Sequence, residues 1–366
     1  MKRKSAFDLI RPYQPGKPIS EVKRELGLDE IYKLASNENP YGFSEAVKTT
    51  ITNSLDTLNI YPDGAAFDLK SELAGFHNIT QSQLMIGNGS DEIIQILCRT
   101  FLEPNTNAVA ATHTFSQYKH NAIIEGAETK EIPLVNGYHD YEKMIEAIDE
   151  STRILWICNP NNPTGTYLEG NAIEDIMKKV PNHVLVVLDE AYFEYVQKEK
   201  RYDSKNLVQQ YENVIVLRTF SKAYGLAALR VGYGIANEKL IEMMEPAREP
   251  FNTSTLAQAA AVTALQDTDF IQNCYESNKK VMNSFAEFCT EQGYKVYDSE
   301  TNFLLVDFHK DGEEVFQYLL SKGFITRSGK ALGLPTCVRI TVGSEDVMNK
   351  LQQVLVTMKK EASSTK

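Results

Sequence analysis

Three short apolar runs constrain the fold of this chain more than any other feature of its sequence. Residues 153–158, 184–188 and 213–217 are rich in aliphatic and β-branched side chains, and polar or turn-forming residues follow each run. Such runs are typical of strands that are covered on both faces, as in a parallel sheet. Residues 45–265 alternate strand-like and helical patterns. We therefore expect an α/β fold with a mainly parallel sheet flanked by helices.

The length of 366 residues suits one large and one small domain, since a domain usually has about 100–200 residues. We expect residues 1–44 to form an N-terminal arm that joins the small domain. Residues 45–265 are expected to form the large domain, and residues 266–366 a small C-terminal α/β domain. Residues 252–264 are rich in alanine and threonine and are expected to begin a long helix between the two domains.

Lys222 is the first candidate for a chemical role. It follows the strand at 213–217, with Thr219 and Ser221 just before it and Arg230 eight residues beyond. Desolvation beside a buried strand lowers the pKa of a lysine, so that its neutral amine can form a Schiff base with a carbonyl. Hydroxyls and an arginine are donors that suit a phosphate. Together they suggest a lysine that binds pyridoxal 5'-phosphate (PLP); the alternative is a surface lysine on a helix-capping turn.

Polar residues also follow the other two strands. Asp189 comes directly after the strand at 184–188, at the carboxyl end where open α/β sheets bind ligands. A carboxylate there would hold the pyridine nitrogen of PLP protonated, and Tyr192 could bond the ring oxygen. Alternatively, Asp189 caps a following helix. Asn162 lies in the rigid, proline-rich turn at 159–165 and is a candidate for the same ring oxygen, although such a stretch is often only a turn.

A glycine-containing stretch at residues 87–92 is a candidate phosphate site. Ser90 and Asp91 are typical of helix starts, and residues 93–101 have the apolar period of a helix. Glycines such as Gly89 let backbone amides approach an anion, and a helix N-terminus attracts one. The stretch matches neither the P-loop nor the dinucleotide-binding pattern, so that alone it is a weak indication.

Four motifs, in this order, resemble those of the class I/II (fold type I) PLP-dependent aminotransferases, and the resemblance covers nearly the whole chain. They are residues 87–92, 159–165, 189–192 and 221–230. Three further stretches are similar to those of the histidinol-phosphate aminotransferases within that family. They are residues 11–16, 34–42 and 61–64. One departure is Ala228, where the family often has glycine; a methyl group should be tolerated there unless the position requires a positive φ.

The resemblance implies roles for individual residues. Lys222 would form the Schiff base with PLP and carry a proton between the substrate Cα and the cofactor, and Asp189 would pair with the pyridine nitrogen. Asn162 and Tyr192 would bond the ring oxygen, and Phe115 would stack on the ring. Lys222, Asp189 and Tyr192 are thus the expected catalytic residues. The residues expected around the cofactor phosphate are Gly89, Ser90, Asp91, Thr219, Ser221 and Arg230.

The resemblance also implies substrate and subunit contacts. Arg339 would bind the substrate α-carboxylate, while Arg327 and Tyr13 would bind the substrate phosphate and Asn39 would also contact substrate. Arginine suits both anions because its planar fork bonds two oxygens at once. For either arginine alone, the alternative is a surface ion pair. Tyr61 would reach the phosphate of the cofactor in a partner subunit, so that a homodimer is expected.

The activity implied by the resemblance is a transamination in histidine biosynthesis. It interconverts L-histidinol phosphate and 2-oxoglutarate with imidazole-acetol phosphate and L-glutamate. The alternatives are an aromatic amino-acid aminotransferase or a related phospho-amino-acid decarboxylase of the same fold. A regulatory module that binds PLP without turnover is an alternative of a different class, which the acidic charge and the lack of a DNA-binding segment disfavour.

Composition excludes several classes of partner. The net charge of −11 argues against nonspecific binding to nucleic acids or anionic membranes. Five cysteines without a C-x-x-C spacing indicate reduced thiols, and neither a leader nor a long apolar run is evident, so that a cytoplasmic protein is expected. The six histidines lack metal-ligand spacing, and we expect no metal.

Overall fold

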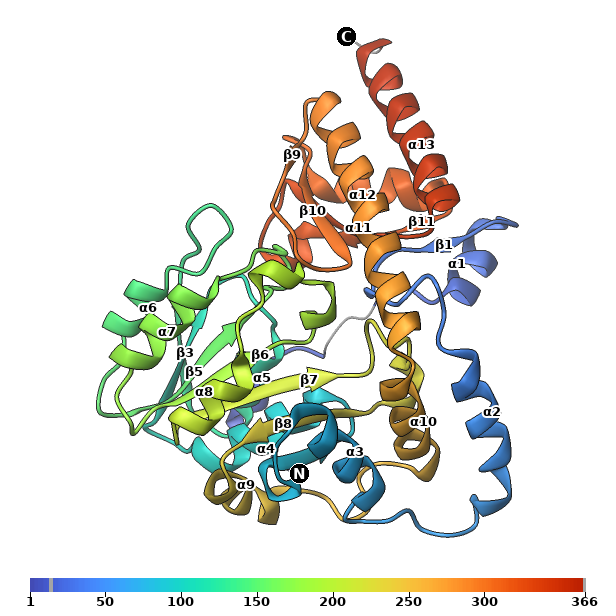
Figure 1. The fold of residues 1–366 in the computed structure, drawn as a ribbon. Helices are drawn as coiled ribbons and strands as arrows, with labels where there is room; N and C mark the ends of the chain where they lie inside the picture. The colour runs from blue at the N-terminus through green and yellow to red at the C-terminus, as the bar shows by residue number, and fades with distance from the viewer. Residues whose placement is uncertain (13–15, 365–366) are drawn as a thin grey trace.

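The computed structural model describes residues 1–12 and 16–364. Within these residues the largest sheet has seven strands in the order β2-β8-β7-β6-β5-β3-β4 (Figure 1). Neighbouring strands are parallel except at β8, which is antiparallel to both β2 and β7. The mainly parallel sheet expected from the sequence is therefore confirmed. Its strands are β2 (Leu84–Gly87), β3 (Asn107–Ala111), β4 (Glu128–Ile132), β5 (Thr152–Cys158), β6 (Leu185–Asp189), β7 (Val214–Thr219) and β8 (Gly232–Ala236).

Helices cover both faces of this sheet, which explains why its central strands are apolar throughout. In β6, Val186 and Leu188 pack into one core, whereas Leu185 and Val187 pack into the core on the opposite face. The first core contains α2 (Glu45–Asn53), α3 (Phe67–His77), α6 (Tyr141–Glu146), α7 (Gly170–Lys179), α8 (Ser204–Gln210) and α10 (Thr255–Gln266). The second contains α4 (Ser90–Phe101), α5 (Gln117–Ile124) and α9 (Glu238–Met244).

A second, antiparallel sheet lies in the C-terminal part of the chain, above the large sheet in Figure 1. Its strands, in spatial order, are β12 (Arg327–Ser328), β13 (Cys337–Thr341), β10 (Phe303–Asp307) and β9 (Lys295–Val296). Three helices share a hydrophobic core with it: α11 (Thr268–Glu291), α12 (Gly312–Ser321) and α13 (Glu345–Ser364). Short 3-10 helices occur at η1 (Ser5–Asp8), η2 (Leu55–Thr57), η3 (Gln81–Gln83), η4 (Phe193–Tyr195), η5 (Lys198–Lys200), η6 (Ala227–Leu229), η7 (Glu245–Ala247) and η8 (Gly329–Leu332).

The N-terminal arm attaches to this second sheet region. β1 (Tyr32–Lys33) pairs in parallel with β11 (Phe324–Ile325), and Val22 of α1 (Ile19–Leu26) packs against Leu320. These contacts agree with an arm that joins a small domain. The boundaries at residues 44 and 265 remain predictions.

The single long helix expected from residue 252 onward is wrong, because the chain forms two helices there. α10 ends at Gln266 and α11 begins at Thr268. Between them, the side chain of Asp267 accepts a hydrogen bond of 3.0 Å from the backbone N–H of Phe270 and one of 2.5 Å from the hydroxyl of Ser44. Asp267 thus caps α11, and this cap favours a new helix start over a continuous helix.

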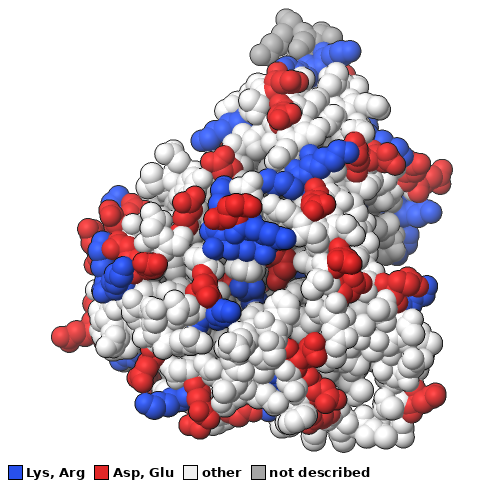
Figure 2. Space-filling model, viewed as in Figure 1, with Lys and Arg blue, Asp and Glu red and all other residues white. Residues whose placement is uncertain are grey.

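The surface carries both signs of charge. Figure 2 shows acidic and basic side chains interspersed over the face seen in Figure 1, rather than a broad basic surface. No helix in the described ranges is long and apolar enough to cross a membrane. All five cysteines lie in the described part of the chain, and each is a buried free thiol.

Candidate active site

A cavity of about 380 Å³ lies at the carboxyl ends of β5, β6 and β7, whose last residues (Cys158, Asp189 and Thr219) line it. This is the edge at which open α/β sheets bind ligands. Most residues predicted to hold a cofactor are brought together here. They are Ser90, Asp91, Phe115, Asn162, Asp189, Tyr192, Thr219, Ser221, Lys222 and Arg230.

Lys222 lies in the loop after β7, where its side chain is half-buried. Its Nζ donates a hydrogen bond of 3.2 Å to the carbonyl oxygen of Ser36. Burial, followed by the charge of Arg339, lowers the pKa of Lys222 to about 8. An appreciable fraction of the amine is therefore neutral near physiological pH. These contacts exclude the freely solvated surface lysine that was the alternative.

Asp189 ends β6 and is only 3% exposed. Its Oδ2 accepts a hydrogen bond of 2.6 Å from the hydroxyl of Tyr118, and its Oδ1 accepts one of 3.2 Å from the backbone N–H of Ala191. Burial raises the pKa of Asp189 to about 6, although both hydrogen bonds favour the charged form. The next residues form η4 rather than an α-helix, so that Asp189 is no α-helix cap. A buried carboxylate whose partners are a phenol and an amide suits a protonated ring nitrogen.

The amino end of α4 forms another wall of the cavity. The first backbone N–H groups of the helix, from Ser90 onward, have no partner within the helix and favour an anion. Gly89 precedes them with a φ of +76°, and a Cβ at this position would lie 2.5 Å from Nη2 of Arg230. Only glycine lets the guanidinium of Arg230 lie this close to the turn.

Arg230 joins this helix end to the hydroxyl residues after β7. Its Nη1 donates to Oγ of Ser221 at 3.1 Å, and its Nη2 lies 3.4 Å from Oδ2 of Asp91. Thr219 in turn donates to Oγ of Ser221 at 3.0 Å. A guanidinium, two hydroxyls and a helix N-terminus at one end of the cavity form a set of donors suited to a phosphate.

Ala228 shows that the departure from the family pattern carries no backbone penalty. It lies within η6, whose right-handed conformation any residue can adopt, and positive φ occurs instead at Arg230, where φ is 53°. The methyl group is therefore tolerated, as expected.

Arg339 reaches from β13 into the same cavity and is 7% exposed. Its Nη1 donates to Oδ1 of Asn162, and its Nη2 donates to the carbonyl oxygen of Ala35 at 2.6 Å. The guanidinium also lies 5.2 Å from the ring centroid of Phe303. Arg339 therefore links the C-terminal sheet to the turn after β5, and it is no isolated surface ion pair.

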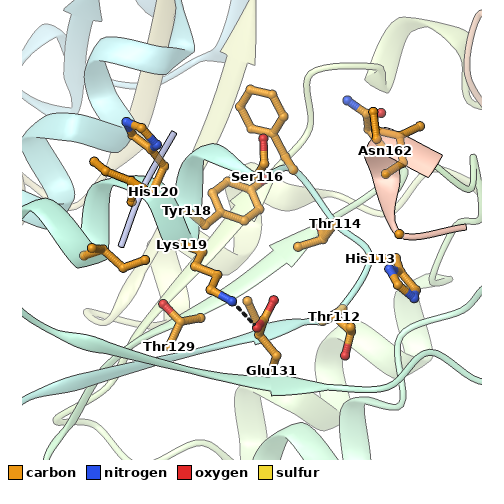
Figure 3. A pocket seen from close by; sticks show the side chains of 18 of the residues that line it. Thr112, His113, Thr114, Ser116, Tyr118, Lys119, His120, Thr129, Glu131 and Asn162 are labelled. Atoms are coloured by element: carbon orange, nitrogen blue, oxygen red, sulfur yellow. Dashed lines mark hydrogen bonds and ion pairs between the residues drawn. The ribbon is translucent and has the colours of Figure 1, made fainter. Parts of the chain in front are cut away.

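A second cavity of about 630 Å³ adjoins the first, since Phe115, Asn162 and Arg339 line both. Figure 3 shows this cavity, with Lys119 bonded to Glu131 at 2.5 Å on one side. The described N-terminal residues 9–12 also line it. The first cavity thus lies next to a larger one, in which a substrate can lie.

Two arginines face each other beside this second cavity. Arg327 on β12 lies directly opposite Arg339 on β13 in the antiparallel register, and both line the cavity. An anion bound in this cavity would accept paired hydrogen bonds from a guanidinium.

Tyr61 is not brought to either cavity in the single chain. The side chain of Tyr61 is 79% exposed and stacks on Phe251, with the ring centroids 4.8 Å apart. Tyr13 lies outside the described residues. The roles given to these tyrosines remain predictions.

Asn39 contacts the loop that carries Lys222 but lines neither cavity. Its Nδ2 donates to the carbonyl oxygen of Ala223 at 2.8 Å and to Sγ of Cys274 at 3.2 Å. Because Ala223 follows Lys222 directly, these bonds give Asn39 a part in holding the lysine loop. A direct contact between Asn39 and substrate remains a prediction.

Two buried polar residues that contact the site were missed by sequence reasoning. Tyr118 is 1% exposed, donates to Asp189 and stacks on Trp156 with the ring centroids 4.4 Å apart. Asn37 is 2% exposed and donates from Nδ2 to the hydroxyl of Tyr192 at 2.8 Å. The partners lie 71 and 155 positions away, respectively, and no local spacing signals contacts at such separations.

Residues 29–355 match the family model of aminotransferase class I and II. The chain is 58% identical to a histidinol-phosphate aminotransferase of Anoxybacillus flavithermus, over 99% of this chain and 97% of that protein. It is 53% identical to the same enzyme of Bacillus subtilis, over 97% and 99%. A solved histidinol-phosphate aminotransferase from Sinorhizobium meliloti, in complex with pyridoxal-5'-phosphate, shares the fold with a TM-score of 0.89 at 24% identity, over 98% of both chains. The chain therefore belongs to the class I and II aminotransferases and, within them, to the histidinol-phosphate aminotransferases.

Proposed function

We propose that this chain is a PLP-dependent transaminase that interconverts L-histidinol phosphate and 2-oxoglutarate with imidazole-acetol phosphate and L-glutamate. The observation that carries the proposal is a cavity that holds a lysine of lowered pKa, a buried carboxylate and Arg339, next to a second cavity that Arg327 and Arg339 both line. The relatives that are 53–58% identical over almost the whole chain support this activity over the aromatic aminotransferase and decarboxylase alternatives.

The donor groups of the first cavity fit PLP at both ends. The amino end of α4, Ser221 and Arg230 would hold the phosphate, because they offer N–H and O–H donors around one point. Asp189 would hold the ring nitrogen at the other end. Phe115, which lines the cavity, would cover one face of the ring.

Bound PLP would supply a carbonyl that takes up the amino group and a ring that accepts electrons from the substrate Cα. Lys222 would take the proton from the substrate Cα and return it, because part of its amine is neutral near pH 7. Asp189 is mainly a carboxylate above its pKa of about 6 and would hold a proton on the ring nitrogen. Asn162 accepts from Arg339 through Oδ1, so that its Nδ2 is the end left to donate to a ligand.

The arginine pair accounts for two different anionic substrates. Glutamate carries an α-carboxylate, whereas histidinol phosphate carries a phosphate and no α-carboxylate. We assign the α-carboxylate of glutamate to Arg339 and the phosphate of histidinol phosphate to Arg327, since the two guanidinium groups lie on facing positions of β13 and β12.

Half-reaction kinetics test this substrate assignment. The PLP form of the protein is mixed separately with histidinol phosphate, phenylalanine and tyrosine, and the visible absorbance of the cofactor is followed. Histidinol phosphate should react with the highest ratio of rate to half-saturating concentration, because it alone supplies an anion to Arg327. A preference for phenylalanine would replace the proposal with an aromatic amino-acid aminotransferase.

We also propose that the active unit is a homodimer, with Tyr61 reaching the cofactor phosphate in the partner subunit. Tyr61 belongs to a group of large apolar side chains that stay exposed in the single chain. They are Leu55, Leu58, Ile60, Tyr61, Phe67 and Phe251, each at least 47% exposed. An exposed apolar group of this size is typical of a protein–protein contact.

Complementation between two impaired chains tests the shared site. A Lys222→Ala chain is mixed and refolded with a Tyr61→Phe chain. Mixed dimers would contain one site with both defects and one site with neither, so that activity should exceed that of either parent. Each parent refolded alone is the control. No gain in activity, or full activity in a species that sediments as a monomer, would remove the proposal of a shared site.

A further inference from the structure

Three functional side chains from different parts of the chain converge on residues 35–37 of the N-terminal arm. Arg339 donates to the carbonyl oxygen of Ala35, and Lys222 donates to that of Ser36. Tyr192 accepts from the side chain of Asn37. Of these arm residues, Asn37 alone acts through its side chain. Its position therefore bears directly on the phenol of Tyr192.

The orientation of the Asn37 amide is fixed by its neighbours. Its backbone N–H donates to Oγ1 of Thr341 at 3.0 Å, and the Thr341 hydroxyl donates to Oδ1 of Asn37 at 2.9 Å. Asn302 donates to the backbone carbonyl of Asn37 at 3.0 Å. Because the carbonyl end of the amide faces Thr341, its NH₂ end faces Tyr192. Asn37, Thr341 and Asn302 are all at most 3% exposed, so that water does not compete for these bonds.

The backbone at this position also suits asparagine. Asn37 has a φ of 57°, in the left-handed region that asparagine and aspartate tolerate better than most other residues with side chains. Asparagine therefore meets two demands at position 37, a left-handed backbone and an amide that both accepts and donates.

This arrangement decides where the hydroxyl hydrogen of Tyr192 can point. An amide NH₂ group only donates hydrogen bonds, so that the Tyr192 oxygen must be the acceptor in its bond with Asn37. The single hydrogen of the phenol is then left for a partner on another side. Tyr192 lines the cofactor cavity and is only 3% exposed, so the cavity is where that hydrogen can be used.

We propose that Asn37 is a positioning residue that directs the hydroxyl hydrogen of Tyr192 into the cofactor cavity. The inference rests on the proposed function, in which Tyr192 bonds the ring oxygen of PLP. Asn37 itself touches neither the lysine amine nor the carboxylate of Asp189. The bonds to Thr341, two residues beyond Arg339 on β13, also join the Tyr192 phenol to the strand that carries the substrate arginine.

Asn37→Asp is the most direct test, because it preserves the shape and the tolerated backbone but replaces a donor with an acceptor. The Tyr192 hydroxyl would then donate to position 37 and turn its hydrogen away from the cavity. Asn37→Gly is the second variant, since glycine keeps the left-handed backbone and removes the side chain. Tyr192→Phe and the double variant Asn37→Asp/Tyr192→Phe complete a cycle that isolates the interaction of the two residues.

The main measurement is the dissociation constant of PLP from the apoprotein, titrated by absorbance and therefore independent of turnover. Asn37→Asp should weaken PLP binding about tenfold, since a redirected buried hydrogen bond is worth roughly this factor. It should also shift the pH at which the visible absorbance of bound PLP changes. In the Tyr192→Phe background, Asn37→Asp should add less than about a twofold further loss. Thermal unfolding of each apoprotein checks that the variants are folded.

The outcomes separate the inference from the proposed function. Tyr192→Phe with unchanged PLP affinity and an unchanged absorbance titration would overturn the role of Tyr192, and the inference with it. A clear loss in Tyr192→Phe but none in Asn37→Asp and Asn37→Gly would overturn the inference alone. Losses that multiply in the double variant would also overturn it, because Asn37 would then act without Tyr192. A loss in Asn37→Asp that vanishes in the Tyr192→Phe background supports it.

Discussion

Asp189→Asn should make the apoprotein more stable near neutral pH, although it damages the site. The carboxylate of Asp189 is 3% exposed, and its two hydrogen bonds come from a phenol and a backbone amide. Burial raises its pKa from the ordinary 3.8 to about 6. The folded apoprotein therefore holds this proton more tightly than the unfolded chain does. Removing the charge should remove the free-energy cost of burying an ionised carboxylate, a cost that a bound ligand would offset.

The size and sign of the effect follow from linkage. One pKa unit corresponds to about 1.36 kcal/mol, so that the difference between 3.8 and about 6 opposes folding by about 3 kcal/mol once the group is ionised in both states. Between these two pKa values the folded state binds more protons, and its stability falls as pH rises. About half of the penalty remains near pH 5, and almost all of it is present near pH 8. An asparagine carries no such penalty at either pH.

Urea unfolding of the apoprotein, with and without Asp189→Asn, measures the effect. The variant should gain up to about 3 kcal/mol near pH 8 and about half as much near pH 5. Asp29→Asn, at an exposed position, controls for the change in net charge and should leave stability within about 0.5 kcal/mol. PLP should bind the variant more weakly. A variant that is less stable than wild type near pH 8, or a gain that does not depend on pH, would refute the reasoning.

Three further predictions concern single residues. Lys222→Ala should still take up PLP noncovalently in an absorbance titration but keep less than about a hundredth of the turnover, since general acid–base help is worth 10²–10⁴-fold. Arg327→Ala should lower kcat/KM for histidinol phosphate at least about tenfold and for phenylalanine much less, because a charge-assisted bond is lost; equal losses would contradict this. Glu190→Gln breaks the buried 2.6 Å ion pair with Arg218 and should lower the free energy of unfolding, measured in urea, by about 3 kcal/mol; an unchanged value would contradict it.

The sheet could be predicted because its central strands carry their own signal. The expected strand at 184–188 differs from β6 by one residue, since a run that is apolar at every position must be covered on both faces. The antiparallel direction of β8 carries no such signal. This strand contains two glycines, and a Cβ at Gly232 would lie 2.6 Å from the backbone N of Ser90. The glycines of β8 thus leave room for the start of α4, and this contact exists only once the chain is folded.

The break between α10 and α11 has a similar cause. Alanine-rich residues before Gln266 and the periodic residues after Thr268 both favour a helix, so that the sequence predicts one continuous helix. Asp267 is bonded to Ser44, which lies 223 positions earlier in the chain. The hydrogen bond to Ser44 and the local cap with Phe270 together favour a break between α10 and α11. The deciding contact therefore comes from tertiary structure.

Within the candidate site, residues at strand ends were predictable and residues that support them were not. Asp189 and Lys222 follow apolar runs, and the carboxyl ends of parallel strands meet at one edge, so that their convergence follows from local pattern. Tyr118 and Asn37 reach the site only through the packing of α5 and of the arm against it. A buried tyrosine or asparagine in the sequence does not reveal which group it will contact.

The buried carboxylate of Asp189 is unfavourable in the chain alone, and the charges of the site are complementary to its proposed ligands. The carboxylate of Asp189 is buried without a cation among its hydrogen-bond partners, and Arg327 lies directly opposite Arg339. A protonated ring nitrogen would pair with the carboxylate of Asp189, and a carboxylate or phosphate would bind the two arginines. Because the penalty at Asp189 grows between about pH 4 and pH 6, binding of PLP should stabilise the fold more near pH 8 than near pH 5. Ligand binding and folding would thus be coupled through the same few buried charges.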